Sequence, residues 1–198
     1  MIKILNINKE KPYAEFESYF KAALTAQQSN IEAISISSYC PEDKEVESRF
    51  VNLKFIKNNE WIFFSNYNSK KSKNFQMHDQ ISVLLFWNKI NIQIRIKAKI
   101  SRTSDEFSDQ YFKSRDKGKN ALAISSMQSS AIESYQDVKN NFNTVLNLNK
   151  FNERPAYWGG FSFIPYYFEF WEGHESRLNK RDSYQMNNGE WHHSILQP

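Results

Sequence analysis

The chain has 198 residues, of which 40% are hydrophobic and 16% aromatic, and its 26 basic and 22 acidic side chains leave a net charge of +4. This length and hydrophobic content predict one globular domain over residues 1–198 and exclude a disordered chain. The charge is too small for a nucleic-acid-binding protein without a basic stripe, and the sequence has no such stripe. One cysteine excludes an internal disulfide, and no apolar run forms a signal-peptide core or approaches the roughly 20 residues of a membrane span. We therefore expect a soluble cytoplasmic protein.

The first forty residues predict a helix followed by a strand. Apolar residues recur at helical spacing over 11–25, after a proline suited to a first helical turn. Residues 31–39 alternate imperfectly between apolar and polar, which predicts a strand, and 41–44 have turn composition.

The stretch 49–71 combines a predicted hairpin with a group of cations. Residues 49–54 and 61–66 are rich in β-branched and aromatic side chains and flank a turn at 58–59. The cations and hydroxyls gathered by this hairpin are Arg49, Lys54, Ser65, Ser69, Lys70 and Lys71. Such a set suits a phosphate group. A solvated edge strand protected by lysines explains the same residues equally well.

The middle of the chain predicts a short helix and two strands. Residues 71–78 favour a helix with Phe75 facing inward, and the nearly continuous apolar run 81–87 predicts a buried central strand. From 90 to 100, isoleucine and alanine alternate with polar residues, which predicts a long half-buried strand. Gln93 lies on its polar face, where the spacing alone favours a solvated glutamine.

Two capping boxes, at 103–106 and 130–133, predict further helices. The first, with Thr103 as the cap, opens a helix that places Tyr111 and Arg115 on one face, and the second opens a helix that ends near residue 148. A short helix over 119–127 lies between them, and 149–156 is a polar loop.

The C-terminal part predicts strands over 158–163 and from 168 onward, then a closing hairpin over 182–196 with a type I′ turn at 188–189. Trp171, taken alone, is more often a core residue. The sequence thus predicts seven or eight mainly antiparallel strands and three or four short helices. This is a mainly β (α+β) fold, a β-barrel with short peripheral helices.

Nucleophilic, phosphate-loop and metal chemistry have little support. The chain lacks a Gly-x-Ser-x-Gly elbow and a glycine-rich loop, and its four histidines lack metal-ligand spacing. The remaining inventory is cations beside hydroxyls and aromatics: Arg49, Lys54, Lys70, Lys71, Arg115, Arg177 and Arg181, with Tyr111, Ser129 and Trp171. It fits a planar, phosphorylated ligand.

In order along the chain, these motifs resemble the pyridoxine/pyridoxamine 5′-phosphate oxidase family from about Pro12 to Pro198. The matching motifs are Arg49-x-Val51-x-Leu53-Lys54, Phe64-Ser65-Asn66, Ser69-Lys70-Lys71, Leu85-Phe86-Trp87 with Gln93, Tyr111-Phe112-x-Ser114-Arg115, Gln128-Ser129-Ser130, Trp158-Gly159-Gly160, Glu169-Phe170-Trp171 and Arg177-Leu178-x-x-Arg181. Each motif is weak alone, and their joint order is specific.

The resemblance implies a split β-barrel homodimer that binds FMN where the subunits meet. It implies an oxidase that converts pyridoxine 5′-phosphate or pyridoxamine 5′-phosphate into pyridoxal 5′-phosphate. Hydride would pass from the substrate C4′ to flavin N5, and oxygen would reoxidise the flavin to give hydrogen peroxide.

The resemblance also implies residue roles. The implied FMN-binding residues are Arg49, Phe50, Val51, Asn52, Leu53, Lys54, Phe64, Ser65, Lys70, Lys71, Gln93, Trp171 and Arg181, with Gln128 and Ser129 from the partner subunit. The implied ligands of the substrate phosphate are Lys54, Tyr111, Arg115 and Lys119. Arg177, Leu178 and Asn179 would lie over the pyridine ring, with Arg177 and Asn179 as catalytic residues. No metal is implied.

Three positions depart from the usual family pattern. The family commonly has Arg at Lys70, Ser at Lys119 and His at Asn179, and the last two departures leave the exact substrate open. One alternative is a related FMN oxidase of another reduced ring compound, as in phenazine biosynthesis. That branch is expected to lose the substrate-phosphate cations, whereas Lys54 and Arg115 are present here. The other alternative is a non-catalytic flavin- or haem-binding split barrel.

Overall fold

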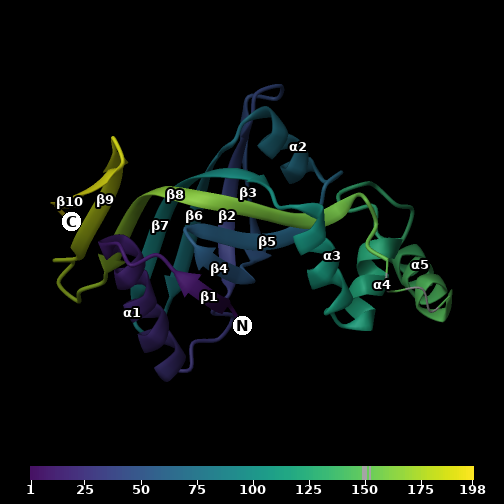
Figure 1. The fold of residues 1–198 in the computed structure, drawn as a ribbon, viewed down its shortest axis with the longest axis horizontal. Coiled ribbons are helices and arrows are strands. Elements are labelled where there is room, and N and C mark those ends of the chain that lie inside the picture. The colour runs from purple at the N-terminus through teal and green to yellow at the C-terminus, as the bar shows by residue number, and fades with distance from the viewer. Residues whose placement is uncertain (149–150, 152) are drawn as a thin grey trace.

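The computed structural model describes residues 1–148, 151 and 153–198, and within them ten strands form one sheet with five helices around it (Figure 1). The strands are β1 (Lys3–Ile7), β2 (Ala33–Cys40), β3 (Glu45–Asn52), β4 (Phe55–Asn58), β5 (Glu60–Asn66), β6 (Gln80–Trp87), β7 (Ile92–Arg102), β8 (Trp158–Glu172), β9 (Lys180–Asn187) and β10 (Glu190–Ile195). The helices are α1 (Lys11–Thr25), α2 (Lys70–Met77), α3 (Asp105–Lys113), α4 (Lys117–Ser125) and α5 (Tyr135–Leu148).

The long strand β8 organises the sheet, whose order is β1-β4-β5-β8-β7-β6-β2-β3. On one edge, β8 pairs with β5 along its first half and with β9 along its second half, and β7 pairs along its other edge. Among the described residues only β1 and β4 pair in parallel. The helices α3, α4 and α5 gather at one end of the sheet, and the β9–β10 hairpin lies at the opposite end (Figure 1).

Several predicted elements are confirmed. The helix over 11–25 is α1, the short helix with an inward Phe75 is α2, and β7 buries alternate residues as its sequence predicted. The closing hairpin is β9–β10, and both of its turn residues, Asn188 and Gly189, have positive φ, as a type I′ turn requires.

The predicted pairing of 49–54 with 61–66 is wrong for β3, and only its last residue is placed as predicted, since the Lys54 N–H donates to the Ile62 carbonyl at 2.8 Å. The turn near Asn58 joins β4 to β5 instead, since a tight turn pairs the residues that flank it directly. Strand β3 pairs with β2, with Arg49 opposite Ile36. Leu53 follows the last residue of β3, donates its N–H to the Glu32 carbonyl at 2.8 Å and is fully buried.

Two other strand predictions need correction. The run 81–87 is not buried on both faces, because β6 exposes Ser82, Leu84 and Phe86 on the open face of the sheet. The predicted strands at 158–163 and 168 onward are one strand, β8. Pro165 lies inside it where the β7–β8 register is irregular, and such a site tolerates a residue without an N–H.

Both predicted capping boxes start too early. Ser104, not Thr103, caps α3, and its Oγ accepts a hydrogen bond from the Phe107 N–H at 3.2 Å. Helix α5 begins at Tyr135, where Ser134 Oγ accepts from the Asp137 N–H at 3.2 Å. The residue that caps a helix is the one directly before its first turn, and several hydroxyl residues compete for that position here. The predicted loop 149–156 lies partly outside the described residues.

The core is aromatic and places the helices relative to the sheet. Phe16 of α1 packs on Trp61 of β5 with 4.4 Å between ring centroids, and Phe63 of β5 stacks on Phe161 of β8. At the start of β8, a Cβ on Gly160 would overlap the Thr103 side chain, so glycine lets the chain before α3 approach the strand closely. This contact fixes α3 beside the ends of β5 and β8.

Candidate functional site

Lys71, in the first turn of α2, is a buried cation with neutral partners. Its Nζ donates hydrogen bonds to Ser69 Oγ at 2.9 Å and to Gln128 Oε1 at 3.1 Å, and its side chain is 8% exposed. Burial, reinforced by the charge of Arg49, lowers the pKa of Lys71 to about 8. A buried ammonium without a compensating charge is unfavourable, so this position favours an anionic ligand.

Arg49 and Lys70 lie beside Lys71 but already share a carboxylate. Glu47 accepts from Arg49 Nη2 at 3.0 Å and from Lys70 Nζ at 2.6 Å. Arg49 Nη1 also donates to Ser38 Oγ at 2.8 Å. Of the other predicted residues on this stretch, Phe50 and Asn52 are exposed and Val51 is half-buried.

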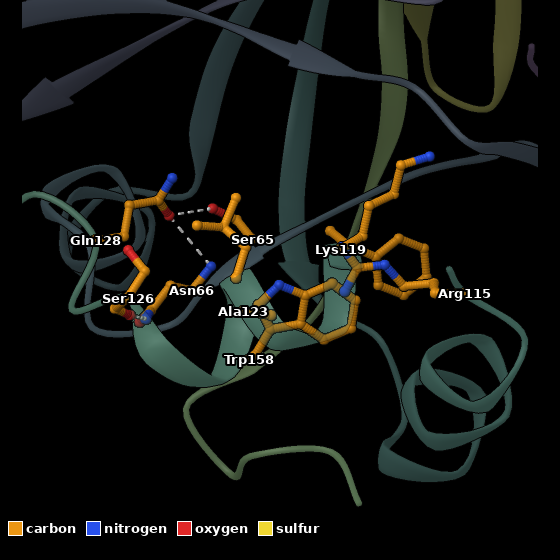
Figure 2. A pocket seen from close by; sticks show the side chains of 10 residues that line it. Ser65, Asn66, Arg115, Lys119, Ala123, Ser126, Gln128 and Trp158 are labelled. Carbon is orange, nitrogen blue, oxygen red and sulfur yellow. Dashed lines mark hydrogen bonds between the residues drawn. The ribbon is translucent and has the colours of Figure 1, made fainter. Parts of the chain in front are cut away.

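Gln128 belongs to the loop after α4 and lies beside Ser65 and Asn66 at the end of β5 (Figure 2). Gln128 Oε1 accepts from Ser65 Oγ at 3.1 Å and from the Asn66 N–H at 3.4 Å. Asn66 Nδ2 donates to the Ser126 carbonyl, which ties the loop to the strand. Within this structure the amide beside Ser65 is therefore the chain's own, whereas the family resemblance implied the amide of the partner subunit. Ser129 is exposed with a φ of 74°.

The four predicted phosphate ligands line one pocket. Helix α3 and the turn after it carry Tyr111 and Arg115, α4 carries Lys119, and Lys54 lies between β3 and β4. The pKa of Lys54 is lowered by its burial and by the charges of Lys119 and Arg115. The residues that the structure adds to this pocket are Met1, Lys3, Phe55, Ser114 and Asp116.

Arg115 connects this pocket to a second one, of about 190 Å³, lined by Ser65, Gln128 and Trp158 among others (Figure 2). Its guanidinium lies 4.3 Å from the Trp158 ring centre. Its Nη1 is buried and has no hydrogen-bond partner among the described residues, and burial lowers the pKa of Arg115 from its ordinary value. A buried, unpaired donor of this kind fits a ligand oxygen.

Phe64 forms an aromatic wall between the two pockets. Its ring stacks on Tyr111 with 3.9 Å between centroids and on Trp158 with 5.3 Å. The stacked rings offer a flat apolar surface, and Trp158 places it beside the Arg115 guanidinium.

Gln93, Trp171 and Arg181 are neighbours in register across β7, β8 and β9. Arg181 donates from Nε and Nη2 to one oxygen of Glu169, at 3.0 and 2.8 Å. Glu169 is 2% exposed, and its other oxygen accepts from Arg95.

The loop between β8 and β9 carries the predicted catalytic residues. Arg177 is exposed with a φ of 60°, and Leu178 is exposed. Asn179 Oδ1 accepts from the His174 N–H at 3.0 Å, so this side chain closes the loop that carries Arg177.

One chain brings together only part of the predicted site. The residues on β3, β5, α2, α3 and α4 are neighbours, whereas the β8–β9 loop lies at the opposite end of the sheet from α3 and α4 (Figure 1). Arg177, Leu178 and Asn179 are thus separated from Tyr111, Arg115 and Lys119 of the same chain.

The site residues that the sequence did not point to include Glu47, Trp158 and Lys3. Glu47 shares a strand face with Arg49 two positions on, so alternation could have found it. Trp158 stands in a motif that was recognised but given no role. Lys3 left no local signal, because only the pairing of β1 with β4 brings it to the pocket.

Comparison with known proteins agrees with the geometry. A family model described as pyridoxamine 5′-phosphate oxidase matches residues 20–149, and one described as the pyridoxine 5′-phosphate oxidase C-terminal dimerisation region matches 158–198. The pyridoxine/pyridoxamine 5′-phosphate oxidase of Rippkaea orientalis is 34% identical over 179 residues, which cover 88% of this chain and 83% of that protein. The protein of the same name from Burkholderia lata is 33% identical over 191 residues, with 94% and 89% covered.

The chain belongs to the pyridoxine/pyridoxamine 5′-phosphate oxidase family. The family predicted from the motif order is therefore confirmed. Membership supports an oxidoreductase, and the matched dimerisation region of this oxidase family suggests a homodimer.

Solved structures confirm the split-barrel fold. PhzG from Burkholderia lata, crystallised with tetrahydrophenazine-1-carboxylic acid, has a TM-score of 0.90 at 22% identity, with 95% of this chain and 93% of that chain covered. An FMN-binding protein from Nostoc punctiforme related to pyridoxamine 5′-phosphate oxidase has a TM-score of 0.78 at 10% identity, with 96% and 100% covered. At these identities the likeness concerns the fold alone. In the described part of this oxidase-family chain, the helices are all too short or too polar to cross a membrane.

Proposed function

We propose that this protein is an FMN-dependent oxidase that converts pyridoxine 5′-phosphate or pyridoxamine 5′-phosphate into pyridoxal 5′-phosphate and releases hydrogen peroxide. The observation that carries the substrate class is the pocket shared by Lys54, Arg115 and Lys119, beside Tyr111. Cations and a phenol converging from three elements suit the oxygens of a phosphate monoester.

The residues around Lys71 fit the phosphate of FMN. Lys71 is buried against the neutral oxygens of Ser69 and Gln128, and Arg49 lies close enough to lower its pKa. Lys71, Arg49 and Ser65 would hold the phosphate, with Lys70 at its exposed side. When bound, FMN supplies the two-electron chemistry that no side chain of this protein can perform.

The chain's own residues position the substrate. Arg115 is oriented by its stacking on Trp158 and presents the unpaired Nη1, which we assign to a phosphate oxygen. The ring of Tyr111 is held by Phe64, and no hydrogen bond from the described residues engages its hydroxyl, which we assign as a donor to the phosphate. Fixing the phosphate in this way sets the position of the substrate ring, which is the main requirement for a transfer between two rings.

A homodimer would complete each site. The β8–β9 loop, which carries Arg177 and Asn179, lies at the opposite end of the sheet from α3 and α4 (Figure 1), so we infer that a second copy supplies these two residues. Phe50 and Phe86, 77% and 55% exposed, lie on the open face of the sheet, and such apolar side chains are typical of an interface. The matched dimerisation region supports the same arrangement.

Anaerobic reduction tests the proposal. The purified protein is expected to be yellow, and pyridoxine 5′-phosphate added without oxygen should bleach the flavin absorbance, while unphosphorylated pyridoxine at the same concentration should not. Admission of oxygen should restore the colour with release of one equivalent of hydrogen peroxide. A flavin-loaded protein that neither phosphorylated vitamer reduces would refute the assignment.

The departure at Asn179, where the family commonly has His, favours one other candidate, an FMN oxidase of a different reduced ring compound. A reduced phenazine carboxylate, of the kind bound to the Burkholderia lata PhzG, is the probe for it in the same anaerobic assay. Lys54 and Arg115 argue against this candidate, since a carboxylate needs fewer cations than a phosphate dianion.

A further inference from the structure

Strand β1 brings Lys3 to the pocket that holds Lys54, Tyr111, Arg115 and Lys119. The Lys3 N–H donates to the Lys54 carbonyl at 2.9 Å, and Lys3 stands opposite Phe55 in the parallel β1–β4 ladder. The position of Lys3 relative to Lys54 is therefore set by backbone hydrogen bonds and not by a flexible terminus.

The Lys3 side chain lies over the aromatic residues at the rim of this pocket. Its Nζ is 6.0 Å from the centre of the Phe55 ring, and that ring makes a T-shaped contact with Tyr111, with 5.2 Å between the two ring centroids. Lys3 and Tyr111 therefore both lie beside the Phe55 ring, and all three residues line this pocket.

The charges around the pocket are unbalanced. Its lining contains four basic side chains, one carboxylate, Asp116, and the Met1 ammonium, which Glu32 pairs at 3.1 Å. Asp116 Oδ1 accepts from the N–H groups of Gly118 and Lys119, at 2.9 and 3.3 Å, so it is committed to capping α4. The pocket therefore attracts an anion of more than one charge.

We propose that Lys3 is a further cationic ligand of the substrate phosphate, acting with Lys54, Arg115 and Lys119. This inference rests on the proposed function, because it names one more residue of the same site. Lys3 is solvent-exposed, so its contribution is that of a partly screened charge. It would act on the phosphate and leave the flavin and the chemical step unchanged.

Kinetics on four FMN-loaded proteins test the proposal: wild type, K3A, K3R and K57A. Lys57 is the matched control, since it is an exposed lysine on β4 paired with β1 but lies outside the pocket. K3A should raise KM for pyridoxine 5′-phosphate about two- to fivefold with kcat unchanged. K3R keeps the charge and should have the KM of wild type. Added salt should shrink the difference between wild type and K3A. A KM for K3A equal to that of wild type would overturn the proposal.

A binding measurement separates this inference from the proposed function. Inorganic phosphate is titrated into the FMN-loaded wild type and K3A by calorimetry, and K3A should bind it about two- to fivefold more weakly. If the wild type oxidises no phosphorylated vitamer, the proposed function fails, yet weaker phosphate binding by K3A still supports Lys3 as an anion ligand. Equal phosphate binding by the two proteins refutes the role of Lys3 whatever the substrate is.

Discussion

Glu47 and Lys70 form an ion pair of 2.6 Å inside the cluster of cations that we assign to the FMN phosphate. The same carboxylate pairs with Arg49 at 3.0 Å. One internal anion thus pairs with two of the three cations, and Lys71 is the third. The phosphate of FMN must share these cations with Glu47, and the carboxylate also repels it.

We predict that E47Q binds FMN more tightly than wild type, by about threefold, because the charge of the competing group is removed while its shape is kept. Fluorescence titration of the apoprotein measures this, with riboflavin as the phosphate-free control and E60Q as the matched variant. Riboflavin affinity should not change in either variant. Weaker FMN binding by E47Q would mean instead that Glu47 orients Arg49 and Lys70 for the phosphate.

The lowered pKa of Lys71 predicts a pH dependence of FMN binding. Because burial brings this pKa from 10.5 to about 8, the ammonium is charged at pH 7 and loses its proton as the pH rises through 8. FMN affinity should be highest below pH 7 and should fall up to about tenfold by pH 9. Binding near pH 8 should take up protons, which appears in calorimetry as a dependence of the enthalpy on the buffer.

Two variants of Lys71 provide the controls. K71R stays charged throughout this range, so its FMN affinity should be flat between pH 7 and 9. K71A should lose about 1.5–3 kcal/mol of FMN binding at pH 7, the range for a charge-assisted hydrogen bond. An affinity of the wild type that is the same at pH 7 and 9 would contradict a role for the Lys71 charge.

Asn179 is predicted to act through the loop that it closes. Its Oδ1 accepts from the His174 N–H, and N179A removes this acceptor, so the loop carrying Arg177 should loosen. We expect kcat/KM for pyridoxine 5′-phosphate to fall about tenfold with FMN affinity unchanged. N179D keeps the acceptor and should retain more activity than N179A. Equal losses in both variants would show that the amide itself is needed at the substrate ring.

Subunit mixing tests the shared site. R115A and R177A alter side chains that belong to opposite ends of the sheet in one chain. Each variant homodimer should be nearly inactive. In a mixed dimer one site contains both altered residues and the other contains neither, so random exchange of the two variants should restore about a quarter of wild-type activity. Mixtures that remain as inactive as their components, although exchange is demonstrated by labelled subunits, would place both arginines in a site within one chain.

The sequence by itself determined the elements whose signal is local. The helix α1, the alternating strand β7 and the β9–β10 turn each follow from side-chain periodicity or from residues that accept positive φ. The order of the motifs was also sufficient to predict the family and the split barrel. Each motif is a set of residue types at fixed spacing, and it can be found without knowing which strands pair.

Only the tertiary structure decided which strands pair and which charges meet. Backbone hydrogen bonds are alike for every strand, so the sequence did not reveal that β3 pairs with β2 and β4 with β5, or that β8 is one strand. The same reason applies to the site. Lys3 meets Lys54, and Gln128 meets Ser65, through contacts between residues far apart in the chain. Such contacts depend on how the whole core packs, since the entropy of closing long loops is repaid only by burial elsewhere in the fold.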